Sequence, residues 1–181
     1  MRPGGELVLR DFSLRPALPS DAQPLADLGR ESFCAAFQHL YRPDDLDGFL
    51  KQAYAPEVVA REIADPQYVH SLADDGNRLL GYCKMQQPSG YTGESDARNP
   101  IALNQLYTQP DLVGRGVGAA LMKWAIDEAR DRGCDAIQLS VWSGNFGAQR
   151  FYERYGFRKI ADIEFWVGSQ CDEEFLFELR L

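Results

Sequence analysis

The residues with the clearest chemical potential form a glycine-rich segment, Val113-Gly114-Arg115-Gly116-Val117-Gly118, directly before a stretch of helical periodicity. Glycines at a strand-to-helix junction leave backbone N–H groups open to a phosphate, and the helix N-terminus adds its positive end. Arg115 adds a formal positive charge at the same place. The segment therefore predicts a cradle for a phosphate or pyrophosphate. A tight turn that needs glycine conformations for its own sake is the alternative.

The same glycines fit the dinucleotide pattern Gly-x-Gly-x-x-Ala through Gly114, Gly116 and Ala119. A nicotinamide-binding unit needs an acidic residue at the end of the next strand, where it holds the ribose. The next predicted strand ends in Val141-Trp142-Ser143, and Asp135 stands before it rather than after it. The sequence therefore favours a different phosphate-containing ligand over a nicotinamide cofactor.

A second group of residues lies between 141 and 157. Asn145 is a good helix N-cap, and Gly156 is a good residue to end the same helix. Tyr152 lies within that helix. On local evidence alone, packing or exposure to solvent explains this tyrosine better than chemistry does.

The composition limits the function classes. The chain has 181 residues, 45% of them apolar and 25% charged, which predicts one globular domain over residues 1–181. A net charge of −8 argues against a nucleic-acid partner, and no apolar run reaches the length of a membrane span. The four cysteines stand singly and the two histidines lie far apart, so we expect no metal site. The N-terminus lacks a signal-peptide pattern, which predicts a cytoplasmic location.

The hydrophobic pattern predicts a mixed α/β fold with one parallel crossover. Alternation predicts strands over residues 7–15, 68–73, 79–86, 101–108, 136–142, 158–167 and 175–181. Helical spacing predicts helices over residues 20–37, 44–53, 57–64, 116–132 and 146–155. Within 101–108 the alternation slips at Asn104-Gln105, which predicts a β-bulge.

Together the two motifs resemble the Gcn5-related N-acetyltransferase (GNAT) family. The glycine segment is similar to the family's acetyl-CoA motif Gln/Arg-x-x-Gly-x-Gly/Ala. Asn145, Ala148 and Tyr152, followed by Gly-Phe, are similar to its Asn-x-x-Ala-x-x-x-Tyr motif. The resemblance is close over about residues 101–160 and looser for the whole element order. It implies a mostly antiparallel sheet that splays at a β-bulge, with flanking helices, and an acetyl-CoA-dependent N-acetyltransferase without a metal.

The resemblance also implies roles for single residues. The backbone of Leu106, Tyr107 and Thr108 would pair with the pantetheine arm as an added strand. Asn145 would bind the pantetheine region, and Tyr152 would protonate the departing CoA thiolate. The pyrophosphate would lie against Gly114, Arg115, Gly116, Val117, Gly118 and Ala119. Val113 replaces the motif's Gln or Arg, so Arg115 is expected to supply part of the missing polar contact.

The acceptor amine attacks the thioester directly in a ternary complex, according to the same resemblance. A free alkylammonium has a pKa of about 10.4, so a base or a water path must remove its proton. Many relatives place a carboxylate where this chain has Ala102, Asn104 or Ser140. We therefore predict a water chain ordered by Asn104 or Ser140, with Glu164 as the second candidate.

The acceptor itself is predicted from the N-terminal half. Phe33, Phe37 and Tyr41 are expected to line the substrate pocket. Residues 31–54 resemble a bacterial spermine/spermidine acetyltransferase subgroup, which implies a polyamine or another small amine. Protein N-termini and peptide amines remain alternatives, as does a non-catalytic regulatory module that binds acetyl-CoA. Because dimers are common among look-alike proteins, the resemblance also implies a homodimer.

Overall fold

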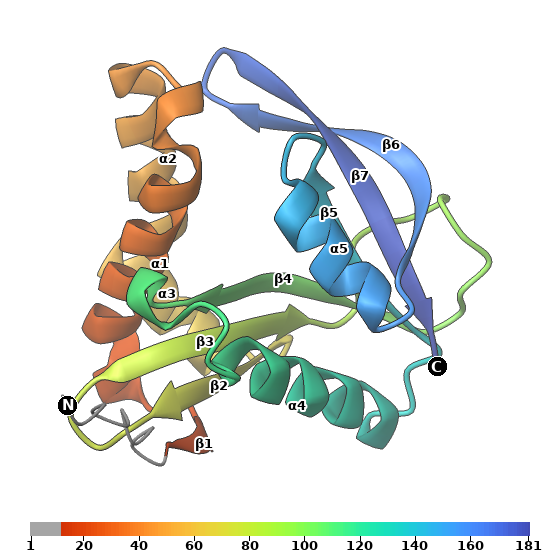
Figure 1. Ribbon diagram of the computed structural model, residues 1–181, viewed down its shortest axis with the longest axis horizontal. Helices are drawn as coiled ribbons and strands as arrows, with labels where there is room; N and C mark the ends of the chain where they lie inside the picture. The colour runs from red at the N-terminus through yellow and green to blue at the C-terminus, as the bar shows by residue number, and fades with distance from the viewer. Residues whose placement is uncertain (1–11) are drawn as a thin grey trace, which may run out of the picture.

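The computed structural model describes residues 12–181 (Figure 1). Its helices are α1 (Ala22–Phe37), α2 (Pro43–Tyr54), α3 (Pro56–Ala64), α4 (Val117–Asp131) and α5 (Phe146–Arg154). Its strands are β1 (Ser13–Pro16), β2 (Tyr68–Asp74), β3 (Leu79–Gln86), β4 (Pro100–Thr108), β5 (Ala136–Trp142), β6 (Arg158–Val167) and β7 (Gln170–Arg180).

All the described strands belong to one sheet with the order β1-β2-β3-β4-β5-β7-β6. Neighbouring strands run antiparallel except β4 and β5, which are joined through α4 and run parallel. β7 lies between β5 and β6, so the last strand of the chain is not at the edge of the sheet. This arrangement confirms the predicted mixed fold with one parallel crossover.

The helices cover opposite faces of the first half of the sheet, as strand alternation requires. Ala73, Cys83 and Met85 pack with α4 in one hydrophobic cluster. Their strand neighbours Leu72 and Tyr82 point the other way and pack with α1 and α3. The sheet is therefore buried on both faces here, which holds β3 and β4 in a fixed position.

The β-bulge lies where the sequence predicts it. Lys84 pairs with Gln105 and Met85 pairs with Leu103, which leaves Asn104 as the extra residue of β4. β4 and β5 pair only over Pro100–Ala102 and Ala136–Gln138. Beyond that short ladder the two strands diverge, and α5 lies between their separated ends (Figure 1). The splay exposes the backbone of β4 after the bulge.

Two strand boundaries differ from the sequence prediction. The first strand begins at Ser13, and most of the predicted range 7–15 lies outside the described residues. The last strand begins at Gln170 rather than at residue 175. Its first residues are polar and resemble a turn in the sequence, but they complete the hairpin ladder with β6 and pair with the end of β5. This earlier start decides which side chains of β7 reach the site.

Within residues 12–181, no helix is both long and apolar enough to cross a membrane. The same residues contain no group of three or more His, Cys, Asp or Glu side chains that could hold a metal ion.

Candidate active site

A groove of about 740 Å³ lies at the start of α4. Residues from β4, from the glycine segment and from α5 line it, and Leu106, Thr108, Gly114, Gly116, Gly118 and Ala119 are among them. The predicted cofactor residues Tyr107, Arg115, Val117 and Asn145 do not line this groove. Val117 is buried in the core, so only its backbone can contribute. Tyr107 points to the other side of β4 and lines a second cavity.

Gly116 explains why the segment needs glycine. It is the N-cap of α4 and has a φ of 86°, a left-handed conformation that other residues adopt at a cost. Without a side chain at the N-cap, nothing caps the N–H groups of the first turn. These N–H groups and the positive end of the helix face the groove, where an anion can bind.

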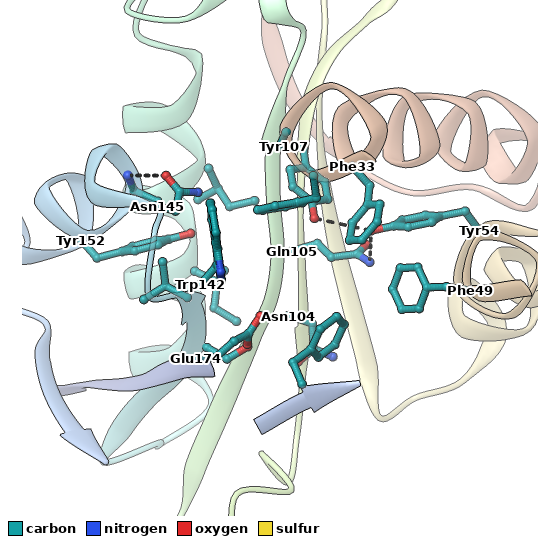
Figure 2. Close-up of a pocket in the computed structure, with 18 of the residues that line it drawn as sticks. Phe33, Phe49, Tyr54, Asn104, Gln105, Tyr107, Trp142, Asn145, Tyr152 and Glu174 are labelled. Atoms are coloured by element: carbon teal, nitrogen blue, oxygen red, sulfur yellow. Dashed lines mark hydrogen bonds between the residues drawn. The ribbon is translucent and has the colours of Figure 1, made fainter. Parts of the chain in front are cut away.

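A cavity of about 350 Å³ lies in the splay between β4 and β5. Its walls come from α1, α2, β4, β5, α5, β6 and β7 (Figure 2). Groove and cavity share Leu106, Ala148 and Tyr152, so the two spaces meet at these three residues. The rings of Phe33, Phe37, Tyr41, Phe49, Tyr54, Trp142 and Phe165 line the cavity.

Tyr152 stands where the groove meets the cavity, and Figure 2 shows its side chain directed toward the cavity from α5. Burial raises the pKa of Tyr152, and the nearby Cys83 and Tyr107 raise it further. The phenol therefore stays protonated at neutral pH and can donate its proton. Asn145 caps the same helix, because its Oδ1 accepts a hydrogen bond from the Ala148 N–H at 3.1 Å.

The strongest proton acceptor in the cavity is Glu174, which the sequence reasoning missed. Glu174 lies on β7 directly opposite Trp142 of β5, and its Oε2 is buried without a hydrogen-bond partner among residues 12–181. Ser140, two residues before Trp142 on the same face of β5, lies within hydrogen-bonding reach of Glu174. Burial raises the pKa of Glu174, the hydrogen bond from Ser140 lowers it, and the charge of Asp172 raises it.

The other predicted candidates for proton transfer are placed less favourably. Asn104 lines the cavity at the bulge, but it is largely exposed and its Nδ2 donates to Gln86 Oε1 at 3.0 Å. Glu164 is exposed on the edge strand β6 and does not line the cavity. Of the predicted residues, Ser140 alone touches both the cavity and the buried carboxylate.

Comparison with known proteins agrees with this geometry. Residues 31–157 match the acetyltransferase (GNAT) family. The chain belongs to the GNAT family of acetyltransferases. It is an acetyl-CoA-dependent N-acetyltransferase.

Several relatives and solved structures are similar to this GNAT protein. It is 26% identical to an uncharacterized N-acetyltransferase of Lactobacillus delbrueckii subsp. lactis, over 85% of this chain and 88% of the relative. It is 30% identical to the thialysine N-epsilon-acetyltransferase of Sus scrofa, over 44% of this chain and 46% of the relative. The crystal structure of PaiA N-acetyltransferase from Thermoplasma acidophilum in complex with coenzyme A aligns with a TM-score of 0.76 and 20% identity. That alignment covers 94% of this chain and 99% of the other, and it shows the shared fold.

Arg115 offers a direct test of whether acetyl-CoA binds in the groove at the start of α4. Its own N–H donates to Leu112 O at 3.1 Å, so only its guanidinium can reach a phosphate. We expect Arg115→Ala to raise the KM for acetyl-CoA by about three- to tenfold, since an exposed charge-assisted contact contributes about 1 kcal/mol. The kcat should change little. Steady-state kinetics with varied acetyl-CoA measure both values, and an unchanged KM would show that the backbone suffices.

A buried polar network supports the bulge from the side opposite the groove. Gln105, directly after the bulge residue, accepts a hydrogen bond from Tyr82 OH at 2.8 Å and donates to Tyr54 OH at 3.2 Å. Tyr54 OH in turn donates to Tyr107 OH at 3.5 Å (Figure 2). The network ties α2 and β3 to the bulged strand and orients two hydroxyl groups at the cavity wall.

Next to this network, His70 is buried on β2 and its Nε2 lacks a partner among the described residues. Burial and, to a smaller extent, the charge of Lys84, which is paired with Glu62, together lower the pKa of His70 to about 4. An unfolded histidine titrates near 6.5, so the unfolded state alone binds the proton between pH 6.5 and 4. The free energy of unfolding must therefore fall as the pH drops through this range.

We expect this histidine to account for a loss of about 2 kcal/mol between pH 7 and pH 5. Urea unfolding of His70→Gln at both pH values should show a correspondingly smaller loss than the wild type. The exposed His39 is the only other histidine of the chain, and His39→Gln is the matched control. An equal pH dependence of wild type and His70→Gln would contradict the expectation.

Proposed function

We propose that this acetyltransferase transfers the acetyl group of acetyl-CoA to a small primary amine by direct attack in a ternary complex, with Glu174 as proton acceptor and Tyr152 as proton donor. The observation that carries the proposal is the position of these two groups. The unpartnered carboxylate oxygen and the protonated phenol line one cavity, and the cofactor groove meets that cavity at Tyr152.

The proposed steps balance as follows. The ammonium of the acceptor gives one proton to Glu174, and the free amine attacks the thioester carbonyl carbon. The C–N bond forms, the C–S bond breaks, and Tyr152 gives its proton to the sulfur. The phenol regains a proton from the nitrogen as the amide forms, and Glu174 releases its proton to water. Backbone N–H groups beside the bulge, near Leu106, are the candidates for stabilising the oxyanion.

A cationic acceptor suits the charge of the cavity. Glu174 lines it, Asp172 lies one pleat further along the same face of β7, and no lysine or arginine is among the described lining residues. A carboxylate with no lysine or arginine in the described lining makes the local potential negative, which favours an approaching ammonium. Polyamines, other small amines and peptide N-termini all carry an ammonium group. Each is therefore a candidate acceptor until their turnover rates are compared.

Release of the CoA thiol, measured with acetyl-CoA across a panel of primary amines and short peptides, tests the proposal. Saturable turnover on at least one small amine is the expected result. The opposite result is binding of CoA by calorimetry without turnover on any amine. That outcome would favour the non-catalytic acetyl-CoA-binding module.

A further inference from the structure

The acceptor cavity has a free carboxylate for one cation only. Glu174 lines the cavity and its Oε2 is unpartnered among residues 12–181, whereas Asp172 is not among the described lining residues. The carboxylate of Asp172 accepts a hydrogen bond from Tyr41 OH at 2.5 Å and another from Gln170 Nε2 at 3.1 Å. A first ammonium can therefore pair with Glu174, but a second one would meet no free carboxylate among the described lining residues.

Aromatic rings occupy the rest of the acceptor end. The ring of Phe33 lies 5.1 Å from Phe37 and 4.7 Å from Phe49, measured between centroids. Phe49 lies 5.7 Å from Phe165, and Phe37 lies 6.3 Å from Trp142. The faces of aromatic rings attract a cation, but more weakly than a carboxylate does. Removing an alkylammonium from water without a counter-charge costs several kcal/mol, so these walls favour an apolar group over a second cation.

Contacts between α2 and the hairpin of β6 and β7 lie beside the acceptor cavity, next to Tyr41 of its lining. Asp45 accepts hydrogen bonds from the Ser169 hydroxyl at 2.7 Å and from the Ser169 N–H at 3.2 Å. Gly168 comes so close that a β-carbon there would overlap the Asp45 carboxylate. We call these contacts, together with the Tyr41–Asp172 hydrogen bond, the clasp. Figure 1 shows the hairpin tip reaching the start of α2, where the clasp lies.

From these three observations we propose that the acceptor is a compact primary monoamine with an aromatic or branched apolar body, whose ammonium pairs with Glu174. This inference rests on the proposed function and narrows it. The cavity of about 350 Å³ must also hold the acetyl group, because its lining includes Tyr152 at the mouth of the cofactor groove. We expect the clasp, which lies beside Tyr41 of the lining, to exclude a polypeptide chain beyond the first residue.

Three acceptors test the inference: 2-phenylethylamine, 1,4-diaminobutane and a tetrapeptide with a free N-terminus and no lysine. We expect the kcat/KM for 2-phenylethylamine to exceed that of the other two by at least about tenfold, which corresponds to about 1.4 kcal/mol. Equal or better use of the diamine or the peptide would overturn the inference while the proposed function stands. If no amine in a broader panel released CoA thiol, the proposed function itself would fail.

Two variants test the physical causes separately. Asp45→Ala removes the two clasp hydrogen bonds from Ser169 and should raise the ratio of peptide to 2-phenylethylamine activity by about threefold or more. Asp47→Ala is the matched control, because Asp47 lies on the same helix, is exposed and pairs only with Lys51 among the ion pairs of the described residues. An unchanged ratio in Asp45→Ala would show that the clasp does not limit acceptor size.

Phe165→Glu places a second carboxylate at the aromatic end of the cavity. The kcat/KM for 1,4-diaminobutane should then rise relative to 2-phenylethylamine, by about tenfold if one ammonium gains a buried counter-charge. Thermal unfolding of each variant verifies that it is folded before the ratios are compared. If the folded Phe165→Glu variant kept the wild-type ratio, the absence of a counter-charge would not be what excludes diamines.

Discussion

Glu174→Gln is expected to lower kcat/KM for the amine by about 10²–10⁴-fold, the range that a positioned general base contributes. The amide keeps the size and much of the hydrogen bonding of the carboxylate, but it cannot accept the ammonium proton. In the wild type, activity should fall on the acid side as Glu174 becomes protonated. Because burial raises the pKa of Glu174, this acid limb lies above the range of an ordinary glutamate. The pH profile of the variant should lack that limb.

The adjacent Glu173 provides the matched control. It is exposed and points to the opposite side of β7, so Glu173→Gln removes the same charge from the same strand without touching the cavity. Its kcat/KM and pH profile should match the wild type. A residual acid limb in Glu174→Gln, or equal losses in both variants, would assign the proton transfer to another group.

The free energy of unfolding of Glu174→Gln distinguishes the loss of the proton acceptor from misfolding. The folded state raises the pKa of Glu174, which means that it disfavours the ionised form relative to the unfolded chain. Replacing the carboxylate with a neutral amide should therefore leave the free energy of unfolding at pH 7 unchanged or slightly higher. A loss of activity together with intact stability points to catalysis rather than to folding.

The backbone features of the proposed cofactor groove could be predicted from the sequence because their signals are local. The glycine segment, the start of α4 and the cap of α5 by Asn145 are each contained in a few consecutive residues. The slip in alternation at Asn104-Gln105 is equally local, and the bulge lies there. Local backbone chemistry decides such features, so the printed sequence is sufficient to place them.

The acceptor half depends on contacts between distant parts of the chain. Glu174 reaches the cavity because β7 inserts between β5 and β6 and pairs with Trp142. The sequence prediction began this strand at residue 175, since the residues from Gln170 onward are mostly polar and resemble a turn. The register that brings Glu174 beside Ser140 is set by the whole sheet, and no short motif encodes it. The alternation of Asp172, Glu174 and Leu176 on one face was the signal available.

The clasp depends on distant contacts in the same way. Asp45 and Ser169 lie 124 residues apart in the sequence, and each is an ordinary polar surface residue when considered alone. Their meeting depends on the length of the hairpin and on the angle of α2. The hairpin length is set by the pairing of β6 with β7, and the position of α2 is set by its packing against α1 and α3.

Tyr152→Phe is expected to lower kcat by about 10- to 100-fold and to leave the KM for acetyl-CoA within about twofold of the wild type. The effect is smaller than that of the missing base because a thiol with a pKa near 8.5 is already a fair leaving group. Tyr152 also forms part of the wall of both the groove and the cavity, so a purely steric role has to be distinguished. Phenylalanine preserves the ring contacts with Phe151 and Phe157 and removes only the hydroxyl.

The separate effects of the substitution on kcat and on KM distinguish a proton donor from a residue that only shapes the wall. A proton donor acts in the transition state, so its loss lowers kcat without weakening acetyl-CoA binding. A wall residue would instead raise KM when altered and leave kcat nearly intact. Tyr68→Phe, on the distant strand β2, serves as the control for removal of a tyrosine hydroxyl from this fold. If Tyr152→Phe retained the wild-type kcat, solvent water would be the proton donor to the thiolate, and Tyr152 would only shape the junction of groove and cavity.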